Sequence, residues 1–312
     1  MTVIKVNHAT KDYGHGRGIF DVSFEVLKGE AFGFLGPNGA GKSTTIRHLM
    51  GFSKLDDGEL SINGKNSWKS AANIKHDVGY LPGELAFPKG MTGDQFIEYM
   101  AKERQLTDMT RIKELKKIFE VDSSKKIKEM SLGMKRKLAV VTAFMHSPRI
   151  LILDEPTSGL DPVMQERFIQ FTLKEKAEGK TILLSSHIFT EVEATCDRIA
   201  IIKDGVVVST VEALALKQNK NKSFKIEFDS FKDYQTFIEN TAFTLSVKRP
   251  EQNQVKLSLT DQKMQQLFIE LSEVKLKFIS EIKFILEDYF MDFYDRKKTV
   301  AAGEENLQDG LH

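Results

Sequence analysis

Short apolar runs separated by polar and glycine residues fill the first part of the chain. Such runs occur at residues 3–6, 22–26 and 31–34, and the residues between them are typical of turns. This pattern predicts short strands. A similar run at residues 60–64 predicts another strand that ends in a turn.

The pattern changes to helical spacing between residues 92 and 146. Apolar residues recur there every three or four positions among many lysines and glutamates, which predicts a helical insertion. Strand patterns return at residues 150–153 and 181–184, with a predicted helix at residues 162–178 between them. A strand, a long helix and a second strand predict two parallel strands of one sheet.

A polar gap at residues 217–223 is predicted to be a linker between two domains. Beyond it, strands are predicted at residues 224–228, 243–247, 255–259 and 276–279. Two helices fall between these strands, and their apolar faces consist of Phe231, Tyr234, Phe237 and Ile238, and of Met264, Leu267, Phe268 and Leu271. The order β-α-β-β-α-β is the ferredoxin-like motif.

The end of the chain has its own pattern. A final helix is predicted from Ile285, Leu286, Tyr289, Phe290 and Phe293. From about residue 299 the chain is polar, and we expect a disordered tail. The domains are therefore predicted at residues 1–217, with a helical subdomain at about 85–146, and at residues 218–298, with a tail at 299–312.

Composition and charge narrow the picture further. The length of 312 residues suggests about two domains, and the net charge of +1 gives no support for nucleic acid or a lipid surface as a partner. The single Cys196 excludes an internal disulfide and fits a reducing compartment. The N-terminus lacks the layout of a signal peptide, and the longest apolar run is far shorter than the ~18–20 residues that span a bilayer. We therefore expect a cytoplasmic chain that does not itself cross a membrane.

A glycine-rich loop carries the clearest indication of chemistry. It fits the pattern G-x-x-x-x-G-K-[ST]. It consists of Gly36, Pro37, Asn38, Gly39, Ala40, Gly41, Lys42, Ser43 and Thr44. Its glycines let backbone N–H groups turn inward around phosphates. Lys42 would reach the β- and γ-phosphates and the Ser43 hydroxyl would bind Mg²⁺, so the loop predicts a nucleotide site.

Two carboxylates follow an apolar strand further along the chain. Asp154 and Glu155 come directly after residues 150–153. Asp154 is expected to hold Mg²⁺ through water, and Glu155 to polarise an attacking water as a general base. An acidic turn after a buried strand is common by itself, but together with the phosphate loop it favours nucleotide hydrolysis.

These motifs resemble those of the ATP-binding subunits of ABC transporters, over residues 1–216 and in the family's order. The resemblance implies an α/β fold, a RecA-like P-loop NTPase core with an antiparallel β subdomain, and ATP and Mg²⁺ as cofactors. Asp161 lies in a match to the family's D-loop. His187 matches the switch histidine that contacts the γ-phosphate, and Tyr13 matches the aromatic residue that stacks on adenine. Without the resemblance, a lone histidine or tyrosine at such positions is more often a core or surface residue.

Residues 130–135 match the family's signature loop, L-S-G-G-Q, imperfectly. Ser131 and Gly133 are retained, whereas Met130, Leu132 and Met134 depart from it. Ser131 can donate its hydroxyl to a γ-phosphate, and Gly133 allows close backbone approach at a helix start. Taken alone, the stretch would be only a capped helix. In the family this loop faces the phosphates bound by the partner subunit, so the resemblance implies that ATP joins two copies, most simply a homodimer.

Another departure lies after Tyr80, Leu81 and Pro82. The family places a Gln there, but this chain has Gly83 followed by Glu84. Gly83 has no side chain to contact Mg²⁺ or water, and Glu84 would do so only if the loop shifts by one residue. The family's other role for this loop, contact with a membrane subunit near residues 84–89, is less affected.

The resemblance implies an ATPase that drives transport through a separate membrane subunit. The variant signature, the missing Gln and the extra domain resemble antibiotic- and peptide-export systems, so we expect export, with the chain at the cytoplasmic face of the membrane. The alternative is a soluble ABC-type ATPase that acts on ribosomes or nucleic acid. Such relatives usually carry two cassettes or a long coiled-coil insertion, and this sequence shows neither.

The accessory domain at residues 218–298 has two interpretations. One is dimerisation or stabilisation, and the other, by analogy of fold only, is a regulatory ligand site. Its sequence shows no catalytic or metal-ligand cluster. The 7 histidines of the chain are scattered without metal-ligand spacing, so no metal besides Mg²⁺ is expected.

Overall fold

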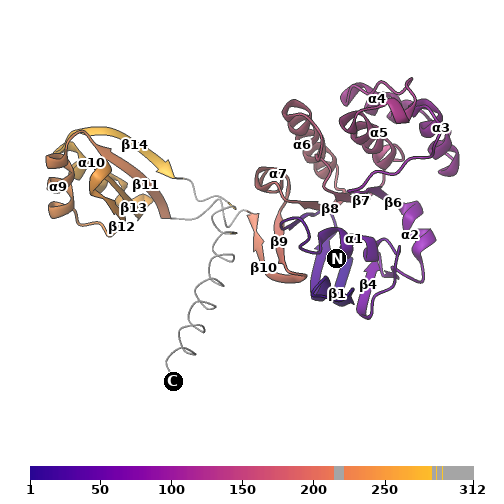
Figure 1. The fold of residues 1–312 in the computed structure, drawn as a ribbon, viewed down its shortest axis with the longest axis horizontal. Helices are drawn as coiled ribbons and strands as arrows, with labels where there is room; N and C mark the ends of the chain where they lie inside the picture. The colour runs from indigo at the N-terminus through magenta and orange to yellow at the C-terminus, as the bar shows by residue number, and fades with distance from the viewer. Residues whose placement is uncertain (214–220, 283–285, 287–289, 291–312) are drawn as a thin grey trace. The chain divides into compact units, whose positions relative to one another are not determined.

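The computed structural model describes residues 1–213 and 221–282, together with Leu286 and Phe290 (Figure 1). The chain divides into two compact units, Met1–Ala213 and Leu214–His312. Each unit has a hydrophobic core of its own.

An antiparallel sheet with the strand order β2-β1-β4-β5 forms one layer of the first unit. Its strands are β1 (Thr2–Asp12), β2 (Gly18–Leu27), β4 (Asp57–Ile62) and β5 (Lys65–Asn66). The first strand is longer than the predicted run at residues 3–6. Register shifts after Val6 and Ala9 interrupt the alternation of apolar residues, while backbone pairing with β2 continues to Asp12.

A second sheet, with the order β10-β9-β3-β8-β7-β6, forms the centre of this unit. Its strands are β3 (Ala31–Leu35), β6 (Val78–Leu81), β7 (Ile150–Asp154), β8 (Thr181–Ser186), β9 (Arg198–Lys203) and β10 (Val206–Glu212). The pairings are parallel except between β10 and β9. Every residue of β3, β7 and β8 is buried, which explains their nearly continuous apolar sequences. The parallel pairing of β7 with β8 confirms the predicted β-α-β unit.

Helices cover these sheets and form the insertion. They are α1 (Lys42–Leu49), α2 (Ala71–Asp77), α3 (Gly93–Glu103), α4 (Thr110–Ile118), α5 (Leu132–Phe144), α6 (Pro162–Ala177) and α7 (Phe189–Thr195), with a 3-10 turn at Ile127–Glu129. Ile46 and Leu49 of α1 pack in one core with residues of both sheets. The helix after the phosphate loop is therefore anchored between the two layers.

Figure 1 shows α3, α4 and α5 grouped together beside α6. An aromatic cluster joins this group to α6, and it consists of Phe119, Phe144, Phe168 and Phe171. The ring centroids of Phe119 and Phe171, and those of Phe144 and Phe171, are 5.1 Å apart. The insertion thus packs against the helix that follows the two predicted carboxylates.

The second unit is an antiparallel sheet with two helices. Its elements are β11 (Asn221–Phe228), α9 (Phe231–Asn240), β12 (Leu245–Arg249), β13 (Gln254–Thr260), α10 (Met264–Ser272) and β14 (Leu276–Ile282), with 3-10 turns at Pro250–Gln252 and Asp261–Lys263. The strand order is β12-β13-β11-β14. The first and second strands are separated by the third, which is the ferredoxin-like arrangement that the element order predicts.

The structure corrects two predictions in this unit. Residues 221–223 are not part of a linker, because their backbone continues the pairing of β11 with Thr260 to Ser258 of β13. Phe231 and Phe268 do not belong to the buried faces of α9 and α10. They are 51% and 55% exposed, whereas Tyr234, Phe237, Leu267 and Leu271 are buried. The predicted linker residues 217–220 lie outside the described residues.

Other predictions for the end of the chain fall on the same undescribed part. The tail at residues 299–312 lies outside the described residues, as do Ile285, Tyr289 and Phe293 of the predicted last helix. Leu286 and Phe290 are described, and both are helical and buried.

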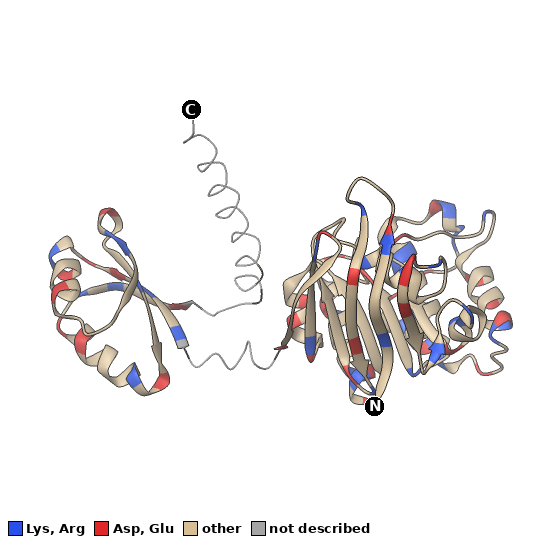
Figure 2. Ribbon diagram, turned by 90° about the horizontal axis from the view of Figure 1, so that it is seen from below, with Lys and Arg blue, Asp and Glu red and all other residues tan. Residues whose placement is uncertain are grey.

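Charge is dispersed over both units. Figure 2 shows basic and acidic residues interspersed along their strands and helices. Within the described part of the chain, no helix is both long enough and apolar enough to span a bilayer.

Candidate active site

The phosphate loop lies between β3 and α1, as its flanking patterns predict. Gly41, the residue before α1, has a φ of 110°, which favours glycine. A Cβ on Gly36 would lie 2.4 Å from the carbonyl oxygen of Ile202 in β9. The loop therefore runs close against a neighbouring strand, and larger residues at these two positions would displace it.

Lys42 is buried at the first position of α1, with its ammonium group against the loop. Its Nζ donates to the carbonyl oxygens of Gly36 at 2.6 Å and of Pro37 at 3.0 Å. The same Nζ lies 3.0 Å from Oε1 of Glu155. Lys42 thus connects the phosphate loop with the second predicted motif.

Glu155 lies between Lys42 and His187. Its φ of 48° is uncommon for a residue other than glycine, and its N–H donates to the carbonyl oxygen of Ser185 at 3.0 Å. Its Oε2 lies 2.6 Å from Nδ1 of His187. Its Oε1 forms an ion pair with Lys42 but accepts no hydrogen bond. The structure brings together the three residues predicted to take part in hydrolysis.

Asp154 is buried at the end of β7. Its Oδ1 accepts a hydrogen bond from the Ser185 hydroxyl. A carboxylate and a hydroxyl oxygen are ligands that Mg²⁺ prefers, and the ion usually keeps several waters and binds substrate phosphates. Asp154 and Ser43 fit such a site. Within the described ranges, no group of three or more His, Cys, Asp or Glu residues could hold a metal ion.

A side chain at the position of the family's Gln would crowd Asp154. A Cβ on Gly83 would lie 2.9 Å from Oδ2 of Asp154 and 3.2 Å from its Cγ. A side chain at position 83 would therefore have to displace the Asp154 carboxylate. Glu84 is exposed at the next position, and its contact with the metal stays a prediction.

Ser131 and Asp161 cap helices in this structure. The Ser131 hydroxyl accepts from the N–H of Met134 at 3.3 Å at the start of α5. Oδ1 of Asp161 accepts from the N–H of Met164 at 3.0 Å at the start of α6. Such caps stabilise a helix by about 1 kcal/mol. The capping interpretation thus accounts for the observed contacts of both side chains, and their nucleotide contacts stay predictions.

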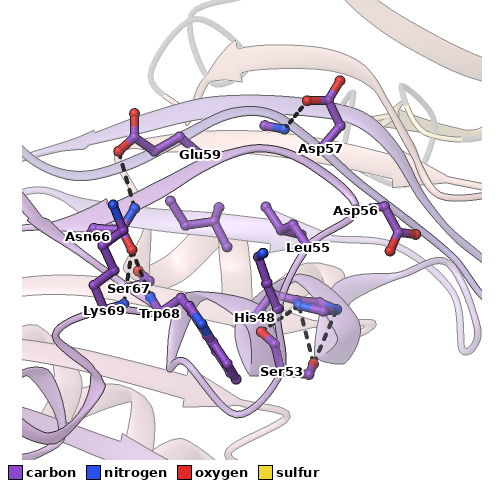
Figure 3. Close-up of a pocket in the computed structure, with 13 residues that line it drawn as sticks. His48, Ser53, Leu55, Asp56, Asp57, Glu59, Asn66, Ser67, Trp68 and Lys69 are labelled. Carbon is purple, nitrogen blue, oxygen red and sulfur yellow. Dashed lines mark hydrogen bonds between the residues drawn. The ribbon is translucent and has the colours of Figure 1, made fainter.

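Tyr13, the predicted adenine-stacking residue, is half-exposed and linked to α1. Its hydroxyl lies 3.2 Å from Nε2 of His48, whose Nδ1 lies 2.9 Å from the carbonyl oxygen of Ser53. Because that carbonyl can only accept, Nδ1 carries the proton and Nε2 accepts from the tyrosine. Burial lowers the pKa of His48, which favours this neutral form. Figure 3 shows His48 beside Ser53 in a pocket that Trp68 also lines.

Three polar residues that support the site escaped the sequence analysis. Ser185 holds Asp154, Arg136 donates to loops beside it, and Glu191 of α7 accepts from the Ser186 hydroxyl at 2.6 Å. Ser186 precedes His187, so Glu191 fixes the start of the loop that bears the histidine. In the sequence each of them is a polar residue within or beside an apolar run, and such a position alone does not indicate a role in the site.

Glu191 is expected to make the stability of the protein depend on pH. Burial raises the pKa of Glu191 to about 7, against hydrogen bonds from Ser186 and Thr157, and the charge of Glu155 raises it further. The folded state therefore holds a proton that the unfolded chain loses near pH 4.5. The free energy of unfolding should fall as the pH rises from there to about 7, by on the order of 3 kcal/mol.

The variant Glu191→Gln should lack this loss. We expect Glu191→Gln to gain stability relative to the unmodified protein between pH 5 and pH 8, measured by urea unfolding at both values. Glu178→Gln, at an exposed carboxylate, is the matched control. An equal stability difference at the two pH values would contradict the assignment.

Comparison with known proteins identifies the family. The model of the family described as "ABC transporter" matches residues 19–158. The uncharacterized ABC transporter ATP-binding protein YhcH of Bacillus subtilis (strain 168) is 34% identical over 232 residues, which cover 72% of this chain and 76% of that protein. The bacitracin transport ATP-binding protein BcrA of Bacillus licheniformis is 34% identical over 231 residues, 72% of this chain and 75% of its own.

Solved structures agree with these matches. A structure described as the ATP-binding subunit of an ABC transporter shares 30% sequence identity, with a TM-score of 0.64 over 70% of this chain and 92% of that one. A dimeric bacterial ABC transporter cassette, MJ0796, is 24% identical and has the same fold, with a TM-score of 0.61 over 67% of this chain and 98% of its own. The chain belongs to the ATP-binding subunits of ABC transporters, which bind and hydrolyse ATP to power transport through a membrane subunit.

Proposed function

We propose that two copies of this chain bind ATP between them at the cytoplasmic face of a membrane and drive export of an antimicrobial compound. Relatives that are 34% identical are named for linearmycin resistance and for bacitracin transport, which supports export of such a compound. The observation that carries the catalytic part is the position of Glu155 between Lys42 and His187.

Hydrolysis follows from how these three side chains rearrange. A γ-phosphate carries more charge than a carboxylate, so ATP would take Lys42 from Glu155. Glu155 is then free to accept the proton of a water as its oxygen bonds to the γ-phosphorus and the bond to the β-phosphate breaks. His187, held at Oε2 of Glu155, orients that water. Mg²⁺ held by Ser43 and Asp154 would neutralise charge on the β- and γ-phosphates.

The site is completed by a second copy. The family's signature loop faces the phosphates bound by the partner subunit, and a dimeric cassette is among the solved structures with this fold. We therefore infer that Ser131 and Gly133 contact ATP held by the other copy. A pair of identical chains supplies two such sites, and the second unit of the chain is a further predicted pairing surface.

A basic groove is the docking surface for the membrane subunit. The groove, of about 380 Å³, is lined by Leu85, Phe87, Pro88, Lys89, Gly90, Ile127, Lys128 and Lys135. Its apolar side chains beside three lysines fit an amphipathic, acidic segment, because complementary charge guides and orients docking. The proposed occupant is a segment of this kind on the membrane subunit.

Cells that express the chain with its membrane subunit test the proposal. We expect the inhibitory concentration of at least one compound in a panel of antibiotics that includes linearmycin and bacitracin to rise by about tenfold or more, and Glu155→Gln to abolish the rise. The double variant Lys89→Glu, Lys128→Glu should lose both this resistance and co-purification of the membrane subunit, because like charges across an interface cost several kcal/mol.

Controls separate the arms of this experiment. Lys54→Glu reverses the charge of another exposed lysine and should leave resistance unchanged. The double variant should keep the ATPase activity of the chain without its partner. Unchanged co-purification would contradict the docking surface, and unchanged susceptibility to every compound of the panel would contradict export of an antimicrobial.

A further inference from the structure

Arg136, on the second turn of α5, is a buried cation bound to neutral groups. It is 2% exposed. Its Nη1 donates to the carbonyl oxygen of Pro82 at 2.7 Å, its Nη2 to that of Gly83 at 2.6 Å and its Nε to that of Ser158 at 3.1 Å. Among the described residues no carboxylate forms an ion pair with it. Burying a charge is costly unless its geometry is good, so this arrangement calls for a specific role.

The three carbonyl oxygens belong to two loops at one edge of the central sheet. Pro82 and Gly83 follow β6, and Ser158 comes shortly after β7, which pairs with β6 in parallel. The carboxyl ends of the two strands therefore lie side by side. The guanidinium group joins these loops to each other and both to α5.

Both loops touch the residues expected to carry out hydrolysis. Gly83 lies so close to Asp154 that a Cβ there would be 2.9 Å from Oδ2. The N–H of Ser158 donates to the carbonyl oxygen of Glu155 at 3.1 Å. Arg136 is thus one residue away from each carboxylate. The charges of Asp154 and Glu155 also act on it, against the burial that lowers the pKa of Arg136.

The first turn of α5 also contacts the loop that follows β7 and contains Ser158. A Cβ on Gly133 would lie 2.9 Å from the carbonyl oxygen of Gly159, and a Cβ on Gly159 would lie 2.9 Å from Cδ2 of Leu132. The loop that contains Ser131 therefore cannot shift far without moving residues 158 and 159. Leu132, which departs from the family's signature, takes part in this contact.

We propose that Arg136 is a positioning residue that couples the signature loop of α5 to the hydrolysis site of its own subunit. The inference rests on the proposed function, in which Ser131 and Gly133 contact ATP bound by the partner subunit. When that contact moves α5, Arg136 moves the backbone of Gly83 and Ser158, and with them the surroundings of Asp154 and Glu155.

The fork of the guanidinium group is what this role needs. Five N–H donors in one plane can bind three carbonyl oxygens at once, whereas a lysine ammonium is a compact charge on a flexible chain. Arg136→Lys keeps the charge and loses the fork. The variant therefore separates positioning from charge compensation.

The test measures the kcat, the ATP affinity and the Hill coefficient of the full-length protein. We expect Arg136→Lys to lower kcat by about tenfold to 100-fold, as misplacement of catalytic groups does. The Kd for ATP should change less than about twofold, and the Hill coefficient for ATP should fall towards 1. A merely structural role would instead lower the Tm and weaken ATP binding in step with activity.

Arg104→Lys is the matched control. Arg104 also donates to two carbonyl oxygens, those of His76 and Val78, but at the other end of β6. The variant Arg104→Lys should leave kcat and the Hill coefficient near the values of the unmodified protein. Equal losses in the two variants, or an unmodified kcat and Hill coefficient in Arg136→Lys, would overturn the proposal.

Two further variants keep the outcomes apart. Gly83→Ala retains the arginine but crowds Asp154, so it should reproduce the loss of kcat. Full activity in this variant would also count against the coupling.

In a Glu155→Gln background, Arg136→Lys should still pair in the presence of ATP. If Glu155→Gln alone fails to pair, the proposed function fails; if only the double variant fails to pair, Arg136 supports the pairing contact itself and the inference is wrong.

Discussion

Glu155→Gln is expected to abolish ATP turnover while ATP stays bound. The amide cannot accept the proton of the attacking water, and loss of a general base typically costs 10²–10⁴-fold in rate. ATP binding should be equal or tighter, because the carboxylate that lies 3.0 Å from Lys42 no longer competes with the phosphates. With hydrolysis blocked, the paired state should accumulate.

Phosphate release under excess ATP measures the first effect, and light scattering after size exclusion measures the second. Glu178→Gln, which changes an exposed carboxylate, should hydrolyse ATP at the unmodified rate and show no ATP-dependent accumulation of pairs. Turnover by Glu155→Gln at an undiminished rate would exclude Glu155 as the general base.

Lys42→Ala is expected to weaken ATP binding itself. Hydrogen bonds to charged groups contribute about 1.5–3 kcal/mol each, so loss of one to the phosphates should raise the Kd about tenfold to 150-fold. The variant also removes a positive charge that would stabilise the γ-phosphate as it is transferred. Hydrolysis at moderate ATP concentrations should therefore fall more steeply than affinity alone predicts.

Titration with a fluorescent ATP analogue gives the Kd, and steady-state kinetics give kcat and KM. Lys54→Ala removes an equal charge from the exposed surface and should bind as the unmodified protein does. The role of Lys42 would be excluded if its variant bound ATP as tightly as this control.

The central fold could be predicted because its strands are buried on both faces. Continuous apolar runs such as Ala31–Leu35 and Ile150–Asp154 have few structural alternatives when turn residues and helices bound them. The order of elements in the second unit sufficed for the ferredoxin-like motif. The ends of strands could not be predicted, because backbone pairing at Asn221 or Lys11 continues where the side-chain pattern has ended.

Side chains that form the site differ in the same way. Lys42, Glu155 and His187 stand in motifs whose spacing indicates their chemistry, and the structure brings them together. Arg136 and Glu191 could not be found, because their partners are a backbone carbonyl or a serine brought near only by the packing of strands and helices. Phe268 shows what periodicity cannot predict. Helical spacing places it near the apolar face of its helix, but packing against the neighbouring strands determines which side chains are buried.

The ion pair of Lys42 with Glu155 has a consequence for product release. The carboxylate lies 3.0 Å from the ammonium group that is expected to bind the γ-phosphate, so it can occupy the position of that phosphate. A free phosphate ion must compete with a tethered anion for that position, and the tethered group has the advantage of effective concentration. Under the proposed mechanism, return of Glu155 to Lys42 after hydrolysis would favour release of the product.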